Sequence, residues 1–547
     1  MNIQNTTPIQ GNKSKYRGRK IAAYAGLAIG VIIIGCIVTL LLLPDSFYDG
    51  FLREKVMQAF HTAYPAYTLT ISKVHYKVVE NRIECDSVSL TANDSSFTGS
   101  ISSMSLSGIK RMSLFRPERI ASDILANSVI DVKNIVLDIP QSQYEFQCTR
   151  LRLSVPDSTV SIDTLELDPL ADSAQAEGGM KASCTMTSFS ARHVGWVQII
   201  RAKRIDTSCF LHATIAAKNI LADFPKSQYE FSCVDIAVSV PDSAITADSA
   251  NIQPVQDDAK YFAGSNTRKT RFIADVPECR ISGADCFAFF RQSMYRARCV
   301  HIRNASLGVL INKDKPEKTD RTKPPMPYEL LNLCKAPLQI DSVEFSDGTL
   351  RYSERYVMTE QAAEFTADDL QILVQGIANR TGGAAATVIH AHGDFMHAGT
   401  MNMLVEIPVA SPAFTMHYSG TTSKMDMTQI NTWLVPGEHK RVTSGELQSS
   451  KFNINVVNGK ANGTVQAIYS NLDIAVLDKK ENGGGLFEQL SSFMARTFKI
   501  RGTNQPDKSG AMKIGVVKYA KKPDDAFFQF VWVALRGGIC DIVGANF

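Results

Sequence analysis

Residues 132–169 read VKNIVLDIPQSQYEFQCTRLRLSVPDSTVSIDTLELDP, and residues 217–254 read AKNILADFPKSQYEFSCVDIAVSVPDSAITADSANIQP. The two stretches align without a gap at a spacing of 85 residues, and 18 of their 38 positions are identical. Unrelated sequences of average composition would share only about two or three positions. We therefore interpret this part of the chain as an internal duplication.

Apolar and polar residues alternate within each copy, for example over residues 144–148 and 151–155. A period of two is typical of a β-strand that has one apolar and one polar face. Pro156-Asp157-Ser158, repeated at 241–243, combines a fixed backbone angle with a turn-forming carboxylate. Strands at intervals of roughly 8–12 residues with short turns predict an antiparallel meander.

Short helices are expected between some of these strands. Three related stretches, at residues 105–120, 188–205 and 280–300, each read as a strand end, one or two helical turns and a new strand. After the Pro-rich, charged stretch 312–327 the strands resume. Asp347-Gly348, Asn458-Gly459 and Asn462-Gly463 predict hairpin turns between them.

The N-terminus predicts a membrane anchor. Residues 21–43 contain 23 uncharged residues after a basic tail, and a helix of that length spans roughly 34 Å, enough for the hydrocarbon core. The basic flank predicts a cytoplasmic N-terminus and a translocated body. A cleaved signal peptide is the alternative, but its apolar region would be shorter and would end in small residues. Residues 526–543 are interrupted by Arg536 and Asp541 and favour a buried or interfacial element.

Composition excludes several classes of protein. The chain has 547 residues, 44% of them hydrophobic, and a net charge of +4, which argues against a disordered chain and against a nucleic-acid-binding one. Eleven cysteines are present, and ten of them follow the anchor. Their irregular spacing and their alternating apolar positions favour small buried side chains over a disulfide framework.

The expected fold is mainly β: an extended, twisted antiparallel sheet, groove-like, with short interspersed helices and one preceding transmembrane helix. The expected divisions are a cytoplasmic tail (1–20), the anchor (21–43), a β-repeat region (44–311), a linker (312–327), a second β region (328–480) and a C-terminal segment of unclear role (481–547).

The pattern resembles the AsmA-like family of bacterial envelope proteins over roughly residues 20–545. The resemblance rests on the single anchor, the strand–helix–strand units and these stretches: Tyr67–Val74, Asp347–Tyr352, Gly420 with Met425-Asp426 and Asn431, Ser444–Leu447, and Tyr469 with Asn471-Leu472. It implies an inner-membrane anchor and a periplasmic body. It further implies a role in outer-membrane biogenesis, with phospholipids bound in a hydrophobic β groove and transported between the inner and outer membranes.

The expected groove residues are the apolar members of the duplicated strands: Ile135, Leu137, Phe146, Leu151, Leu153, Ile220, Phe231, Ile236 and Val238. A long apolar sheet face needs something to cover it, and acyl chains would serve. Two alternatives stay open. The apolar faces could pack into a closed core, and the chain could be an envelope assembly or scaffolding protein that binds other envelope proteins, including those of the outer membrane, without a lipid conduit.

No enzyme activity is expected. The sequence has no G-x-S-x-G elbow, no P-loop and no H-E-x-x-H motif, and no cofactor is expected. The densest histidine cluster is His390, His392 and His397 around Asp394. His390, His392 and Asp394 would share one strand face and could hold zinc, but a plain polar sheet face is favoured, so no metal is expected.

Overall fold

The computed structural model describes residues 53, 57, 60–61, 64–77, 80–108, 127–139, 144–169, 182–202, 206–317, 325–357, 360–379, 386–409, 411, 413–477, 495–497, 500–523 and 525–544. The predicted tail and anchor (1–43) lie outside this part of the chain. Within it, no helix is long and apolar enough to cross a membrane.

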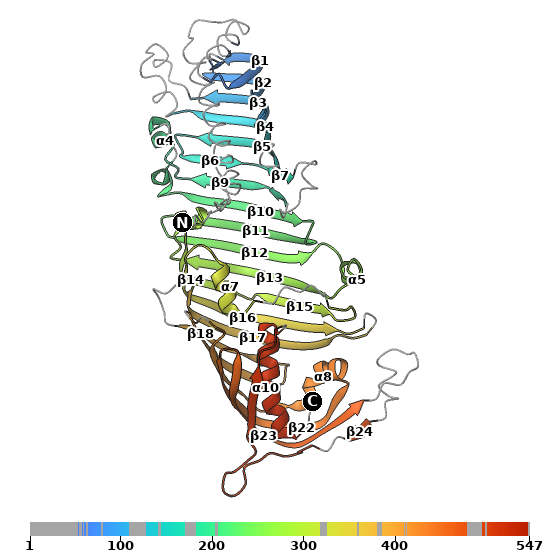
Figure 1. Cartoon of the computed structure of the whole chain (residues 1–547). Helices are drawn as coiled ribbons and strands as arrows, with labels where there is room; N and C mark the ends of the chain where they lie inside the picture. Colours follow the sequence, from blue (N-terminus) through green and yellow to red (C-terminus); the bar gives the residue numbers. More distant parts are fainter. Residues whose placement is uncertain are drawn as a thin grey trace, which may run out of the picture. The chain divides into compact units, whose positions relative to one another are not determined.

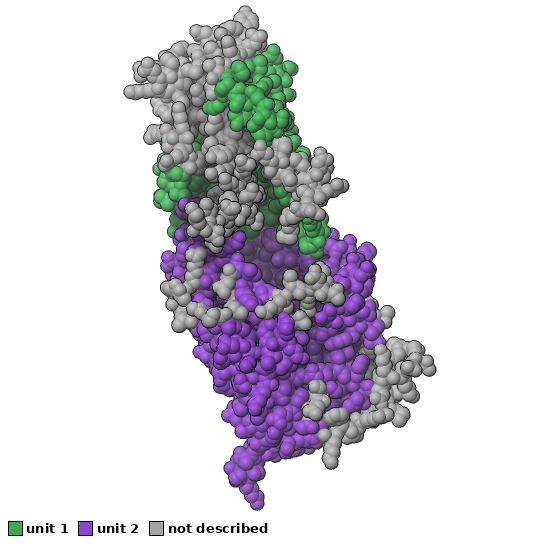
Figure 2. Space-filling view, viewed as in Figure 1, with its two compact units in different colours: residues 1–227, 235–241 green, residues 228–234, 242–547 purple. Residues whose placement is uncertain are grey.

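The described strands belong to one large mixed β-sheet with few, short helices. The chain divides into two compact units (Figure 2). Unit 1 contains residues up to 227 together with 235–241, and unit 2 contains 228–234 together with 242–547. The division falls within strand β11 (Tyr229–Ser239).

Unit 1 is a series of antiparallel strands that follow one another in chain order (Figure 1). Its elements are β1 (Tyr67–Lys77), β2 (Arg82–Ala92), β3 (Thr98–Ser107), β4 (Val129–Ile139), β5 (Tyr144–Ser154), β6 (Thr159–Ile162), β7 (Leu165–Pro169), β8 (Ser183–Met186), β9 (Ser188–Arg192), α4 (Trp196–Ala202), the 3₁₀ helix η4 (Thr207–Phe210) and β10 (Thr214–Phe224). β6 and β7 both pair with β5, and β8 and β9 both pair with β10, so each pair acts as one interrupted strand.

Unit 2 continues with longer strands. Its elements are β12 (Ala244–Pro254), α5 (Asp258–Ala263), β13 (Lys269–Ser282), α6 (Cys286–Phe290), β14 (Tyr295–Arg303), β15 (Ser306–Asn312), α7 (Pro327–Leu333), β16 (Leu338–Arg355), β17 (Ala363–Ala378), β18 (Ala386–Phe395), β19 (Gly399–Pro408), β20 (Met416–Thr422), β21 (Met425–Asp426), the 3₁₀ helix η5 (Met427–Ile430), α8 (Asn431–Glu438), β22 (Lys440–Val457), β23 (Lys460–Leu477), β24 (Ala495–Thr497), β25 (Gly515–Ala520) and α10 (Phe527–Val543).

The expectation of a purely antiparallel sheet is wrong at one place. β14 and β15 both pair with β16 in parallel. Parallel neighbours need a crossover connection, because the chain must return to the end from which it started. The connection between β15 and β16 makes that return, and α7 lies within it. The sheet is therefore mixed.

Two of the three expected hairpins are also wrong. Asn458 and Gly459 form a two-residue turn between β22 and β23, with φ of 50° and 73°, as expected for a type I′ hairpin. Asn462-Gly463 instead lies within β23. Asp347-Gly348 lies within β16, where Asp347 has φ of 55° and the pairing with β17 is locally shifted. A residue with positive φ can therefore kink a continuous strand as well as end one.

Kinks of this kind recur in the middle of the strands. Asn134 in β4 and Asn219 in β10 have φ of 49° and 48°. The side-chain amide of Asn134 donates a hydrogen bond to Ser102 Oγ at 3.0 Å, and that of Asn219 donates to Thr187 Oγ1 at 2.8 Å. Ser102 and Thr187 are themselves 85 residues apart, so the duplication also includes the neighbouring strand.

Short helices are present in both of the predicted stretches that the structure describes. The expected helical turns in 188–205 and 280–300 correspond to α4 and α6, whereas 109–126 lies outside the described residues. Residues 526–543, expected as a buried or interfacial element, form the single helix α10 on the sheet of unit 2.

Several residues of the family-like pattern have structural roles. Asn431, at the start of α8, exchanges two hydrogen bonds with the backbone of Val442, at 2.9 and 2.8 Å. The Tyr469 hydroxyl donates to the carbonyl of Arg501 at 2.8 Å. These contacts fasten helix and loop segments to β22 and β23.

Candidate functional site

In unit 1, apolar residues of neighbouring strands line up in rows that cross one face of the sheet from β1 to β10. Each row consists of residues paired directly with one another on neighbouring strands, and such residues point to the same face. One row is Leu69, Leu90, Gly99, Leu137, Phe146, Leu167, Cys184 and Ala222. Another row is Val74, Cys85, Met104, Val132, Leu151, Ile162, Phe189 and Ala217.

The kinks keep the apolar residues on this one face. In β4 the buried residues Ile130 and Val132 occupy even positions, whereas Ile135 and Ile139 occupy odd positions after Asn134. All four belong to one cluster of buried side chains, although a strict period of two would place them on opposite faces. We name this side of unit 1 the apolar face.

The expected groove residues of the first copy all lie on the apolar face. Ile135 is buried, and Leu137, Phe146, Leu151 and Leu153 are partly buried and pack against the same cluster. In the sequence, residues 144–148 and residues 151–155 show two separate patterns of alternating apolar and polar residues. The structure joins them in one strand, β5, whose alternation changes phase in the middle.

The second copy is less buried. Val238 is buried, and Ile220, Phe231 and Ile236 are partly exposed. Ile236 and Val238 belong to unit 1, and Phe231 belongs to unit 2. Ile220 precedes Ala222 by two residues in β10 and so shares its face.

Unit 2 has apolar rows of its own, and their members are not among the groove residues predicted from the sequence. One row crosses the sheet through Ile245, Ile281, Val300, Val343, Val374, Ile389, Val405, Tyr418 and Ile454. A second row crosses it through Ala247, Cys279, Ile302, Phe345, Ile372, Ala391, Met403, Gly420 and Phe452. Neither row contains a charged residue. We name this side of unit 2 its apolar face.

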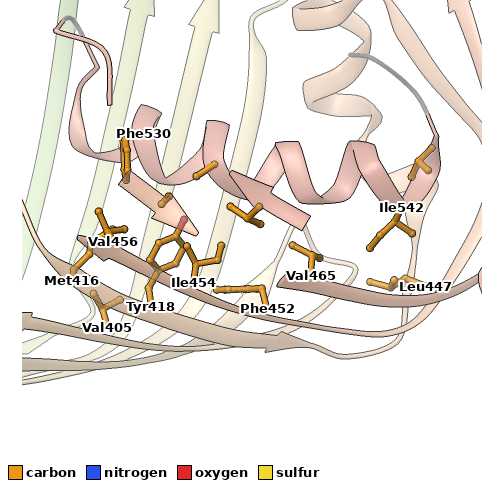
Figure 3. Packing of buried hydrophobic residues seen from close by; sticks show 14 of the residues in the cluster. Val405, Met416, Tyr418, Leu447, Phe452, Ile454, Val456, Val465, Phe530 and Ile542 are labelled. Atoms are coloured by element: carbon orange, nitrogen blue, oxygen red, sulfur yellow. The ribbon is translucent and has the colours of Figure 1, made fainter. Parts of the chain in front are cut away.

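Helix α10 covers one part of this face (Figure 3). Phe530, Ala534, Gly538 and Ile542, spaced four apart, form its buried side and pack against the core formed by β20, β22, β23 and β25. Burial there raises the pKa of Tyr469 to about 12. The two charges that interrupt the apolar run are paired: Arg536 with Glu438 at 2.9 Å and Asp541 with Lys513 at 2.8 Å.

Beyond Ser249 in β12, whose φ of 53° shifts the phase of the strand as Asn134 does in β4, large apolar side chains on the same face are accessible. Ile252, Phe272 and Leu307, on β12, β13 and β15, are 44%, 47% and 41% exposed. Ile252 and Leu307 both pair with Ala274, which places them in one row, and Phe272 precedes Ala274 by two residues. These positions can therefore contact an apolar ligand without any rearrangement of the sheet.

The opposite face of unit 2 carries many polar side chains, with Leu373 and Leu404 among them, and we name it the polar face. His390 and His392 line a hollow of about 1240 Å³ together with side chains such as Gln371, Asn402 and Lys451. His392 Nδ1 lies 2.8 Å from Asn402 Oδ1. Within the described part of the chain, His390, His392 and Asp394 do not form a group with metal-ligand spacing, whereas Cys299, His301 and Glu344 do.

None of the ten described cysteines forms a disulfide. Six of them are buried, as expected for small apolar side chains: Cys85, Cys148, Cys209, Cys233, Cys286 and Cys299. Burial raises the pKa of the Cys85 thiol to about 12, so this group stays protonated at neutral pH.

Comparison with known protein families finds no matching family model, and no curated protein matches the chain.

Proposed function

We propose that the chain is a phospholipid-binding protein of the bacterial envelope. In this proposal, residues 21–43 anchor it in the inner membrane, its body lies in the periplasm, and the apolar faces hold acyl chains. It would assist the transport of phospholipids between the inner and outer membranes. No enzyme activity is part of the proposal.

The observation that carries this proposal is the set of uncharged rows with accessible members. Burying a CH₂ group contributes about 0.8 kcal/mol, so an acyl chain that lies along several rows would be bound by many small contributions. Ile252, Phe272 and Leu307 offer apolar side chains that are partly exposed. Headgroups would remain in water, because the rows contain no charged partner for them.

The test uses the full chain, purified in mild detergent. Co-purified lipid is identified by mass spectrometry, and transfer of a fluorescent phospholipid between liposomes is measured. We expect bound phospholipid, and we expect Phe272→Asp and Leu307→Asp to lower transfer roughly tenfold, as a loss of about 1.4 kcal/mol would.

Leu221→Asp is the matched control. Leu221 is 44% exposed, but in β10 it points away from the face shared by Ile220 and Ala222. Transfer should be unchanged in this variant. If no lipid co-purifies, or if all three variants transfer lipid like the unaltered chain, the proposal is wrong.

A scaffolding role is the second candidate, and two exposed apolar helix surfaces favour it. Phe290 of α6 is 53% exposed, and Leu330 and Leu333 of α7 are 53% and 69% exposed. Crosslinking in cells to specific envelope proteins, lost in Phe290→Asp or Leu333→Asp but kept in Phe272→Asp, would support this role instead.

A further inference from the structure

Three different metal-binding side chains meet on the polar face of unit 2. Cys299 and His301 are two residues apart in β14, so their side chains share one face. Glu344 in β16 is the direct parallel partner of His301. One donor atom from each of the three residues lies within 4.8 Å of the others, and His301 Nδ1 is 3.0 Å from Glu344 Oε2.

We infer that Cys299, His301 and Glu344 form a binding site for Zn²⁺ or a similar transition-metal ion. Sulfur, nitrogen and carboxylate donors together suit zinc, whereas magnesium and calcium prefer oxygen donors alone. Three protein ligands leave a fourth position of the usual tetrahedron for water or another ligand. This inference does not depend on the proposed lipid binding.

The surroundings suit such a site. Cys299 is 9% exposed, while the side chains of His301 and Glu344 are 45% and 48% exposed and line the polar hollow. A metal ion can therefore enter from the hollow and keep its open position toward it. Ser282 Oγ donates to the Cys299 carbonyl at 3.4 Å, which helps to fix the strand that supplies two ligands.

One positive charge beside the site is already compensated. Arg280, in β13, is the direct partner of His301, and its Nε lies 2.6 Å from Glu278 Oε1. The Arg280 guanidinium is thus paired with Glu278, which is not one of the three proposed ligands. The site lies on the side of the sheet opposite to Val300 and Val343, so metal binding and the apolar face use different surfaces.

A plain ion pair between His301 and Glu344 above a buried thiol is the competing interpretation. Titration of the full-length protein with Co²⁺ under reducing conditions separates the two, because a thiolate ligand produces an intense near-ultraviolet charge-transfer band. We expect one Co²⁺ per chain with this band, and displacement of Co²⁺ by Zn²⁺. Cys299→Ser should abolish the band. His301→Ala and Glu344→Gln should weaken binding by more than the roughly 10- to 100-fold that loss of an outer-sphere partner costs.

The controls are His390→Ala, in the same hollow, and Cys279→Ser, a partly buried cysteine on the apolar face. Both should bind Co²⁺ like the unaltered chain. The inference is overturned if the full chain binds no Co²⁺ with a thiolate band, if Cys299→Ser keeps that band, or if His390→Ala loses it. If circular dichroism shows that Cys299→Ser is unfolded, the half-exposed His301→Ala decides: unchanged affinity in that variant overturns the inference.

Discussion

At the scale of single residues, the positive-φ positions in the middle of the strands explain how one apolar face persists. Asn134 and Asn219 adopt the left-handed region, which Asn tolerates better than most residues. Along each of these strands the apolar residues change from even to odd positions or the reverse. The kink at the positive-φ residue keeps them on one face despite this change. Asn304, with φ of 53°, follows Asn219 by another 85 residues, so the kink recurs once more in the region of β14 and β15.

Replacing Asn134 by Val tests this role. We expect Asn134→Val to destabilise unit 1 by about 1–2 kcal/mol, because a β-branched residue is strained at positive φ. Asn134→Gly, which accepts the backbone angle, should cost less, although it also loses the hydrogen bond to Ser102. Urea unfolding of the two variants provides the comparison. Equal stability of the two would show that the backbone angle is unimportant.

The burial of Cys85 leads to a second residue-scale prediction. Its side chain is 1% exposed and the pKa of its thiol is raised to about 12, so little reactive thiolate forms at neutral pH. We expect Cys85 to resist alkylation by iodoacetamide at pH 7.5 in the folded protein and to react in urea. Peptide mass spectrometry measures both states, and rapid labelling of the folded chain at Cys85 would contradict the assignment.

At the scale of elements, α10 depends on a close approach to the sheet. A Cβ placed at Gly538 would lie 2.5 Å from Val465 Cγ2 and 2.8 Å from Val517 Cγ2, and one placed at Gly515 would collide with the Gly538 carbonyl. The adjacent Gly537 has nothing within 4 Å of the corresponding position. The close packing of α10 on the sheet thus requires glycine at position 538 but not at position 537.

Gly538→Leu should therefore loosen α10 by about 1–3 kcal/mol, the usual cost of overpacking. Gly537→Ala should be neutral or should stabilise the helix by up to about 1 kcal/mol, since alanine is the better helix former. Hydrogen exchange of the α10 amides measures the difference. Similar protection of α10 in both variants would refute the proposed packing constraint.

The contact between α10 and β25 should also depend on pH. Hydrogen bonds from the Lys513 ammonium and the Val516 backbone N–H lower the pKa of the Asp541 carboxyl below its usual value. Because the folded-state pKa is depressed, this stabilisation is complete above the unfolded pKa of about 3.9 and is lost as pH falls through the folded value. We expect Asp541→Asn to lower the urea midpoint of unit 2 at pH 6 and to have a smaller effect near pH 2.5. An equal effect at both pH values would contradict this.

The elements could be predicted from the sequence to different degrees. Alternation identified strands in the duplicated region, and Asn458-Gly459 identified a true hairpin, because both features act over a few residues. The hairpin predicted at Asp347-Gly348 is wrong, because the positive φ that suits a hairpin turn also occurs at a kink inside a long strand. The parallel pairing of β16 could not be predicted, because no local pattern states which distant strand becomes a neighbour.

At the scale of the whole molecule, the chain has two units with separate buried clusters. We expect unfolding in more than one step, since long repetitive chains commonly depart from two-state behaviour. Asn134→Val should shift only the step that belongs to unit 1, and Gly538→Leu only the step that belongs to unit 2. Denaturant titration followed by hydrogen exchange resolves the steps. A single transition, shifted by both variants, would show that the units unfold together.

The amino-acid sequence alone shows that the chain is strand-rich, that it contains a duplication at a spacing of 85 residues, and that the groove candidates of the first copy are apolar at strand spacing. These properties follow from side-chain chemistry and from the period of the backbone. The three-dimensional fold was needed to show that Ile130 and Ile135 share a face, that α10 covers one part of the apolar face, and that Cys299 and His301 lie beside Glu344. The reason is physical: kinks change the phase of a strand, and ladder hydrogen bonds choose partners that are distant in sequence.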